Sequence, residues 1–172
     1  ETTIRSTAAS SSVIGAGSYA SQVLLPALKE APAVLRVLVS AGGVSGVHAG
    51  KKHGFASTST EAARALEDPD SSAVVIATRL DSHAQYVVRA IEQRKHVFVE
   101  KPLAINREQL ASIMTAWQAA RQSGFEPIVM TGFNRRFAPH VLRMKSLLAG
   151  RAEPKSLVMT VNAGAIPAEH WT

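Results

Sequence analysis

The chain of 172 residues contains no cysteine, few aromatic residues and no long hydrophobic run. The absence of cysteine excludes disulfide bonds and metal sites built from thiolates. No apolar run approaches the roughly 20 residues that a membrane-spanning helix needs, so we expect no membrane segment. Residues 1–11 are small and polar without an apolar centre, which excludes a secretory signal and indicates a leader or linker. These features favour a cytoplasmic location.

Positive charge is in excess, because the net charge is +6. The basic residues are scattered, and only Phe133 and Phe137 are interleaved with any of them. Nucleic-acid modules concentrate positive charge on one face and add stacking aromatic side chains. We therefore expect no nucleic-acid partner and favour an anionic small molecule.

Hydrophobic residues make up 46% of the chain, and apolar runs alternate with helical patterns along most of it. The run at residues 73–78 is continuous and β-branched, as in a strand buried on both faces of a parallel sheet. The alternation predicts an α/β fold, a doubly wound parallel sheet with helices on both faces. The predicted strands span residues 12–15, 35–40, 73–78, 96–100 and 127–133, and the predicted helices span residues 18–30, 44–53, 58–67, 81–93, 106–123 and 138–148.

The pattern changes after Pro154, where residues 155–162 predict one more strand. A final strand with no partner after it would be a poor end for a complete protein. We therefore expect a nucleotide-binding domain at residues 12–154, followed at residues 155–172 by the truncated start of a second, α+β domain. His170 and Trp171 would then belong to the substrate side of the protein.

A glycine-rich turn at residues 15–20 joins the first predicted strand to the first predicted helix. Its spacing is the G-x-G-x-x-G/A fingerprint, which places a dinucleotide pyrophosphate on the N-terminus of the helix. Gly15 permits the turn, Gly17 lets the backbone approach the phosphates, and Ala20 allows the helix to pack closely on the strand. The cofactor-binding candidates of this turn are Gly15, Gly17, Ser18, Tyr19 and Ala20.

The choice of cofactor depends on the end of the second predicted strand, where NAD enzymes carry Asp or Glu for the ribose diol. Here Ser40 is followed by alanine and two glycines, without a carboxylate. Ser40 with Lys51 or Lys52 could bind a 2′-phosphate, which a carboxylate would repel. The cofactor is thus NAD or NADP, with NADP modestly favoured. The alternative is that both lysines lie on a solvated helix face.

A second motif, residues 96–102, ends another predicted strand in Glu100-Lys101-Pro102. Pro102 keeps Lys101 out of helical geometry, so Lys101 projects from the strand end toward the nicotinamide edge. A lysine there can hydrogen-bond a substrate hydroxyl and pass on its proton as hydride leaves the same carbon. The alternative is an exposed lysine at the start of a turn. We take Lys101 as catalytic and all three residues as cofactor-side candidates; the Lys101–Pro102 bond is cis or trans.

Further candidates follow the strand that ends near Thr78. Thr78 can line the nicotinamide or ribose pocket, and Arg79 belongs to the same loop. His83, in the first turn of the next helix, is either a cofactor contact or a packing and capping residue. Right-handed crossovers would bring Gly15, Ser40, Thr78 and Glu100 to the carboxyl edge of one sheet, where ligands bind in this architecture.

Two arginines follow the last sheet strand, between Phe133 and Phe137. Arg135 and its neighbour could clamp a carboxylate or phosphate, with Asn134 at the rim of the site, or form surface ion pairs instead. No metal site is expected, because the histidines lack the spacing of ligands.

With these residues, the chain resembles the Gfo/Idh/MocA oxidoreductases, named after glucose-fructose oxidoreductase and inositol dehydrogenase. The matching pieces are residues 15–20, Ala77-Thr78 with His83, residues 96–104 and residues 132–137. The resemblance implies an N-terminal Rossmann domain that binds NAD or NADP, and a C-terminal α/β domain with substrate and oligomer contacts. It also implies oxidation or reduction of hydroxyl carbons in sugars, cyclitols and related compounds, with Lys101 as the catalytic lysine.

Residues 132–139 and 162–167 look most like a branch found beside polysaccharide-biosynthesis genes, sometimes fused behind a medium-chain alcohol-dehydrogenase-like domain. Arg79 departs from the family, which commonly has proline there. The family's catalytic aspartate and histidine lie in the second domain, so the resemblance implies a fragment that binds cofactor but is inactive by itself. It also implies a homo-oligomer formed through that domain. The main alternative is a non-catalytic Rossmann module that binds nucleotide as a sensor or regulatory subunit.

Overall fold

The computed structural model describes residues 9–160, 162, 164 and 165. Contacts within the chain define two units, Glu1–Phe133 (unit 1) and Asn134–Thr172 (unit 2). The division falls at Phe133, whereas the sequence places the start of the second domain at residue 155. No helix in the described part of the chain has the length and apolar character to cross a membrane.

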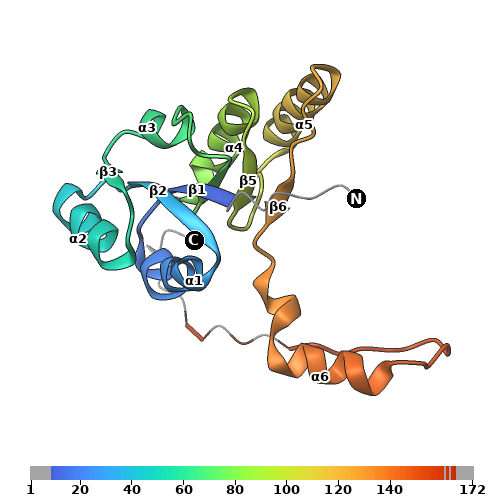
Figure 1. The fold of residues 1–172 in the computed structure, drawn as a ribbon. Helices are drawn as coiled ribbons and strands as arrows, with labels where there is room; N and C mark the ends of the chain where they lie inside the picture. The colour runs from blue at the N-terminus through green and yellow to red at the C-terminus, as the bar shows by residue number, and fades with distance from the viewer. Residues whose placement is uncertain (1–8, 161, 163, 166–172) are drawn as a thin grey trace, which may run out of the picture. The chain divides into compact units, whose positions relative to one another are not determined.

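Unit 1 contains a six-stranded sheet in the order β3-β2-β1-β4-β5-β6, and all neighbouring strands are parallel (Figure 1). The strands are β1 (Ala9–Ile14), β2 (Ala33–Val39), β3 (Ser57–Ser59), β4 (Ala73–Ile76), β5 (His96–Val99) and β6 (Val129–Thr131). The strand order reverses between β1 and β4, which is the position where doubly wound sheets bind ligands. The predicted fold class is confirmed.

Helices cover both faces of this sheet, with α1 and α2 on one face and α3, α4 and α5 on the other (Figure 1). The helical segments of unit 1 are η1 (Ala20–Leu24), α1 (Leu25–Glu30), α2 (Gly43–His53), α3 (Ala63–Leu66), η2 (Leu80–Ser82), α4 (His83–Glu92) and α5 (Arg107–Gln122). The Asn106 side chain accepts a hydrogen bond from Gln109 N at 2.8 Å and thus caps the start of α5.

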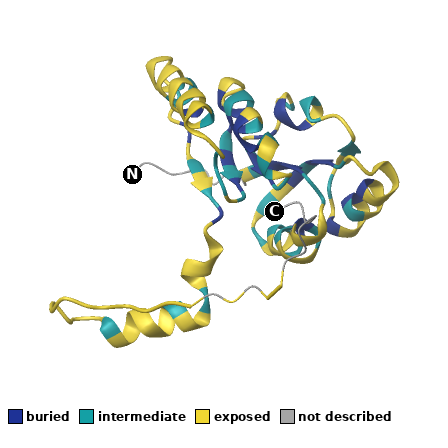
Figure 2. Ribbon diagram, turned by 180° about the vertical axis from the view of Figure 1, so that it is seen from behind, coloured by how far each residue is buried: buried dark blue, intermediate teal, exposed yellow. Residues whose placement is uncertain are grey.

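The core divides into two layers because successive strand residues point to opposite faces. Val74 and Ile76 pack in the cluster that contains residues of α3, α4 and α5, whereas Val75 packs in the cluster with Leu25 of α1. Figure 2 shows the buried residues concentrated in the strands and on the helix sides that face them. Burial on both faces explains the continuous apolar runs of the sequence.

The sheet begins earlier in the chain than the sequence indicates. β1 starts at Ala9, which pairs with Ala33, so residues 9–11 belong to the sheet and not to the expected leader. The register of β1 on β2 shifts between Ser11 and Val13, and Val37 N donates to Ser12 Oγ at 3.3 Å there. This serine hydroxyl satisfies a buried N–H that the shift leaves without a ladder partner.

The predicted helix at residues 58–67 is wrong over its first half. Ser57–Ser59 form β3, which pairs with Val37–Val39, and α3 covers only Ala63–Leu66. The backbone of β2 lies inside the sheet and needs partners on both sides, so a tertiary requirement overrides the local pattern.

Unit 2 contains η3 (Asn134–Phe137) and α6 (Pro139–Leu148), and neither has a buried residue. The strand predicted at residues 155–162 is wrong, because residues 155–160 and 162 form no regular element. A strand needs a partner for its backbone groups, and the described residues of unit 2 include none. His170 and Trp171 lie outside the described residues.

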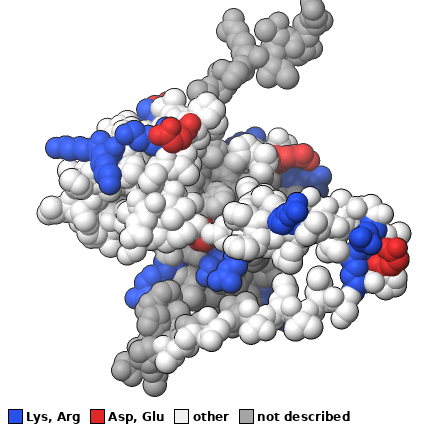
Figure 3. Space-filling view, turned by 90° about the horizontal axis from the view of Figure 1, so that it is seen from below, with Lys and Arg blue, Asp and Glu red and all other residues white. Residues whose placement is uncertain are grey.

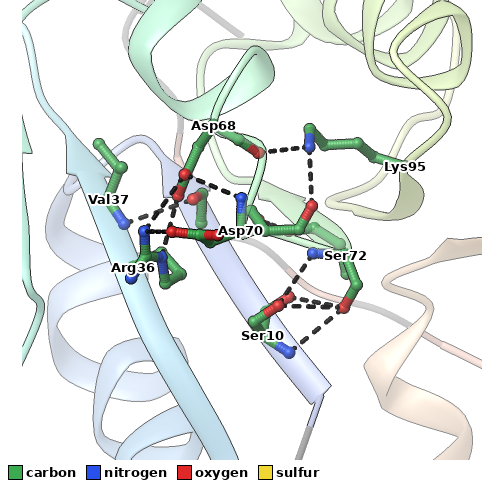
Figure 4. A network of polar contacts seen from close by, with 10 residues as sticks. Ser10, Arg36, Val37, Asp68, Asp70, Ser72 and Lys95 are labelled. Carbon is green, nitrogen blue, oxygen red and sulfur yellow. Dashed lines mark hydrogen bonds and ion pairs between the residues drawn. The ribbon is translucent and has the colours of Figure 1, made fainter. Parts of the chain in front are cut away.

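A network of hydrogen bonds and ion pairs connects segments at the amino-terminal side of the sheet (Figure 4). Lys95, which is 5% exposed, donates to Asp68 O and Ser71 O, both at 2.7 Å. Arg36 of β2 pairs with the Asp68 carboxylate at 3.1 Å and also with Asp70. The network ties β2 to the turns that precede β4 and β5.

We expect this network to make the stability of the fold sensitive to acid. Burial tends to raise the pKa of Asp68, but the hydrogen bond from Arg36, that from Asp70 N and the charges of Arg36 and Lys95 outweigh it and lower the pKa. The stabilisation is therefore complete above the unfolded pKa of about 4 and is lost as the pH falls through the lower folded value.

Thermal unfolding between about pH 2 and 6 measures this effect. Asp68→Asn should lower the Tm at neutral pH and flatten its decline in acid. Asp70→Asn is the matched control and should change little, since the Asp70 side chain is 69% exposed. An equally steep decline in Asp68→Asn and the wild type would contradict the prediction.

Candidate functional site

Backbone hydrogen bonds extend the sheet ladder beyond the strand ends at the carboxyl edge. The N–H groups donate from Gly15 to Val39 O (2.9 Å), from Ser40 to Ser59 O (3.0 Å), from Ala77 to Ile14 O (2.8 Å), from Glu100 to Ile76 O (2.9 Å) and from Gly132 to Val99 O (2.8 Å). These bonds place the segments that follow the strands along one edge, as the right-handed connections predict. The edge brings together Gly15, Ser40, Thr78 and Glu100.

The two glycines of the first turn have different surroundings. Gly15 has φ +107°, and a Cβ there would lie 2.3 Å from Ala77 O, so the fold requires glycine at this position. Gly17 is exposed, and no described atom lies within 4 Å of the place where its Cβ would be. The turn therefore leaves open space beside Gly17, where the fingerprint places a pyrophosphate.

The helix that follows this turn begins as the fingerprint predicts. Residues 18–30 are helical, and Ala20 is buried with 2% exposed. Ser18 and Tyr19 are exposed in the first turn. Ser21 N donates to Gly17 O at 2.9 Å, which fixes the entry of the helix. A helix N-terminus in this position favours an anion, through its N–H groups and its dipole.

The expected contribution of two lysines beside Ser40 is wrong. Lys51 and Lys52 lie in the last turn of α2, about 12 Å along the helix from its start near Ser40. Lys29 Nζ, from the last turn of α1, donates to Lys52 O at 3.2 Å. The C-terminal ends of α1 and α2 thus meet away from the carboxyl edge, and the lysines form the solvated face that was the alternative.

Glu100 and Lys101 follow β5 directly. Lys101 is exposed, and its N–H donates to Glu100 Oε2 at 3.3 Å. Glu100 Oε1 is buried and has no hydrogen-bond partner among the described residues. The Lys101–Pro102 peptide bond is cis. The site therefore combines an exposed amine with a buried carboxylate oxygen that has no donor among the described residues.

Gly132 is a site residue that the strand-end analysis missed. A Cβ at Gly132 would lie 2.6 Å from Glu100 Oε1 and 3.1 Å from the ring of Phe98. Glycine at this position therefore makes room for the Glu100 carboxylate. The available signal was its place at the end of a predicted strand, which it shares with Gly15.

The segment after β4 carries Thr78, Arg79 and His83. Thr78 Oγ1 lies 2.7 Å from Ser82 Oγ, which donates to Arg79 O at 2.8 Å. His83 is 1% exposed, and its Nδ1 and Nε2 lie 2.7 Å from Pro102 O and 3.1 Å from Thr78 O. Both ring nitrogens face backbone carbonyls, so neither is directed to a cofactor.

Asn134 and Arg135 lie in η3 of unit 2, and their part in the site stays a prediction. The guanidinium of the neighbouring Arg136 lies 4.9 Å from the centre of the Phe137 ring. Among the described residues, no three His, Asp or Glu side chains gather as a set of metal ligands. On the face seen in Figure 3, Lys and Arg side chains stand in separate groups with uncharged surface between them.

Comparison with known proteins agrees with this geometry. The profile of the Gfo/Idh/MocA oxidoreductase family, described as an NAD-binding Rossmann fold, matches residues 10–131. A myo-inositol 2-dehydrogenase from Thermotoga maritima is 30% identical over 98 residues, which are 57% of this chain and 28% of that protein.

Solved structures share the fold, and two of them illustrate the similarity. A levoglucosan dehydrogenase in complex with NADH and levoglucosan has a TM-score of 0.67 and 28% identity, over 81% of this chain and 39% of that one. A 3-ketoreductase from Actinomadura kijaniata in complex with NADP has a TM-score of 0.71 and 25% identity, over 82% of this chain and 43% of that one. The chain thus spans less than half the length of these relatives. By its matching profile, its sheet order and its glycine turn, the chain belongs to the Gfo/Idh/MocA oxidoreductase family.

Proposed function

We propose that the protein transfers hydride between the nicotinamide of NAD or NADP and a hydroxyl-bearing carbon of a sugar-like or cyclitol substrate. The observation that carries this proposal is the placement of the glycine turn and Lys101 at one sheet edge, beyond β1 and β5, which lie on either side of β4 in the parallel sheet. A dinucleotide bound across the switch point between β1 and β4 would have its pyrophosphate on the turn. Its nicotinamide would then extend toward β5 and Lys101.

The residues of the edge fit such a cofactor in charge and in space. The open space beside Gly17 and the N-terminus of the first helix suit a pyrophosphate. Thr78 and Glu100 would face the nicotinamide half, where Glu100 Oε1 lacks a donor among the described residues. The bound cofactor supplies the site that accepts or donates hydride.

Lys101 would transfer the proton in the same reaction. As the substrate is oxidised, Lys101 Nζ would hydrogen-bond the substrate hydroxyl and pass on its proton while hydride leaves the same carbon; reduction runs in the opposite sense. The exposed amine at the end of β5 suits this role. Pairing the two transfers balances the charge that would otherwise build up on the substrate oxygen.

The substrate class rests on the relatives, which are named as dehydrogenases of myo-inositol and levoglucosan. We propose a related polyol, bound together with residues beyond the described part of the chain. Assembly as a homo-oligomer through a second domain, a cytoplasmic location and the narrower likeness to the polysaccharide-biosynthesis branch stay predictions.

Cofactor binding is the direct test of this proposal. NADH and NADPH are titrated separately into the chain, and unfolding is followed by thermal shift. At about 100 times the Kd, a ligand that binds only the folded state contributes about 2.7 kcal/mol, a shift of several degrees in Tm. If neither compound raises the Tm or changes its own fluorescence, the chain by itself lacks the proposed site.

We further propose that NADP binds more tightly than NAD, because no carboxylate follows β2 to bind the ribose diol. Ser40→Asp should reverse this preference, since a carboxylate there repels the 2′-phosphate and accepts hydrogen bonds from the diol. We expect NADPH affinity to fall about 10-fold or more. The control Ser40→Asn has the same size without the charge and should change NADPH affinity much less. Equal losses in the two variants would contradict the electrostatic explanation.

A further inference from the structure

His83 is the least exposed ionisable side chain among the described residues, and it lies at the working edge of the sheet. It is the first residue of α4, the helix that follows β4. Its ring contacts two chain segments that are far apart in sequence, the loop at Thr78 and the turn at Pro102. The position thus links the segment after β4 to the segment after β5.

Both contacts are with backbone carbonyl oxygens, which only accept hydrogen bonds. A ring N–H must therefore donate in each bond that forms. The contact from Nδ1 to Pro102 O is the shorter, at 2.7 Å, whereas that from Nε2 to Thr78 O is 3.1 Å. Two lone pairs facing each other at 2.7 Å would repel, so the geometry indicates that Nδ1 carries a proton and donates to Pro102 O.

Lys101 lies between two anchored neighbours as a result. On one side, Glu100 N donates to Ile76 O at 2.9 Å, which continues the ladder between β4 and β5. On the other side, Pro102 O accepts from His83. The backbone of Lys101 is thus held at both ends by the β4–α4 segment, although its side chain is exposed.

We propose that His83 is a positioning residue for Lys101, acting through its Nδ1 hydrogen bond to Pro102 O. The role in catalysis rests on the proposed function, in which Lys101 handles the substrate proton. The longer contact between Nε2 and Thr78 O is a hydrogen bond only where Nε2 also carries a proton, and the proposal does not depend on it. A displacement of about 1 Å in a reacting group can cost about 100-fold in rate, so anchoring this turn matters for turnover.

Two substitutions separate the two ring nitrogens. The side-chain amide nitrogen of asparagine lies near the position of Nδ1, and that of glutamine lies near the position of Nε2. His83→Asn should therefore keep the bond to Pro102 O, and His83→Gln should lose it because its amide nitrogen reaches only Thr78 O. The two variants carry the same amide group at the same position and serve as controls for each other.

The first readout is amide hydrogen exchange of residues 101–104 in the 172-residue chain without cofactor. We expect His83→Gln to accelerate this exchange about 10-fold relative to His83→Asn. The second readout is turnover in the natural full-length protein, where kcat should fall about 10- to 100-fold in His83→Gln with KM for the cofactor nearly unchanged. His83→Asn should retain most of the activity.

Equal effects of the two variants on exchange would overturn the proposal, because a packing role does not distinguish the nitrogens. Separation in exchange without separation in kcat would support the anchoring of the turn and refute the positioning role of His83 in catalysis, while the proposed function is tested separately by substitution of Lys101. If either variant fails to fold, NMR of the wild-type imidazole decides. A slowly exchanging Nδ1–H supports the proposal, and an unprotonated Nδ1 overturns it.

Discussion

Replacing Lys101 with methionine should lower hydride transfer by about 10²- to 10⁴-fold, the usual contribution of a positioned acid–base group. Methionine nearly preserves the length of the side chain and removes the amine. The backbone at this position is held by hydrogen bonds of Glu100 and Pro102, so we expect the turn to keep its conformation. Cofactor affinity should change no more than about threefold, because the proposed pyrophosphate site lies on the other side of the switch point.

The measurement is turnover of myo-inositol and related polyols in the natural full-length protein, with Kd for NADPH and NADH from fluorescence. Lys51→Met is the matched control, because Lys51 is an exposed lysine in the last turn of α2, away from the edge. It should leave kcat unchanged. If the wild type binds cofactor without turnover, and neither substitution changes cofactor binding, the protein would be the nucleotide sensor and not the enzyme.

Adding the same methyl group at Gly15 and at Gly17 should affect two different properties, the stability of the fold and the affinity for the cofactor. Gly15→Ala should destabilise the fold by about 2–4 kcal/mol, because the backbone is strained at φ +107° and Cβ would lie 2.3 Å from Ala77 O. Gly17→Ala should leave the Tm nearly unchanged, because its Cβ meets no described atom within 4 Å. We expect Gly17→Ala to weaken cofactor binding instead. The affinity for the cofactor should fall about 10- to 100-fold, because the pyrophosphate would lose a charge-assisted hydrogen bond.

Thermal unfolding and cofactor titration of the two variants test the contrast together. Each variant is the control for the other, since the added group is identical and the positions are two residues apart. A Gly17→Ala variant that binds NADPH as tightly as the wild type would exclude a pyrophosphate beside Gly17. A Gly15→Ala variant with an unchanged Tm would show that the Ala77 carbonyl moves away easily.

The sequence alone predicts most of the scaffold, because its signals are local. The continuous apolar run at β4 identifies a strand buried on both faces, and the alternation of apolar runs with helical periods requires parallel connections. Parallel, right-handed connections in turn require that Gly15 and Glu100 meet at one edge. The candidate site follows from pattern and handedness without any tertiary contact.

Other features depend on what a segment meets in space. β3 is a strand because the edge of β2 beside Ser57 has backbone groups that need hydrogen-bond partners. The sequence of β3 itself does not show this requirement. Lys51 and Lys52 lie away from Ser40 because an 11-residue helix carries them there.

The role of His83 shows most clearly what the sequence alone does not predict. A histidine at the start of a helix can contact a cofactor or pack, and the sequence alone leaves both possibilities open. Its bond to Pro102 O joins residues 19 positions apart, and its direction depends on how α4 packs beside β5. Local patterns therefore determined the strands, the turn and the edge of this protein. Long-range packing decided which polar atoms face one another, because hydrogen bonds depend on distance and direction that no periodicity encodes.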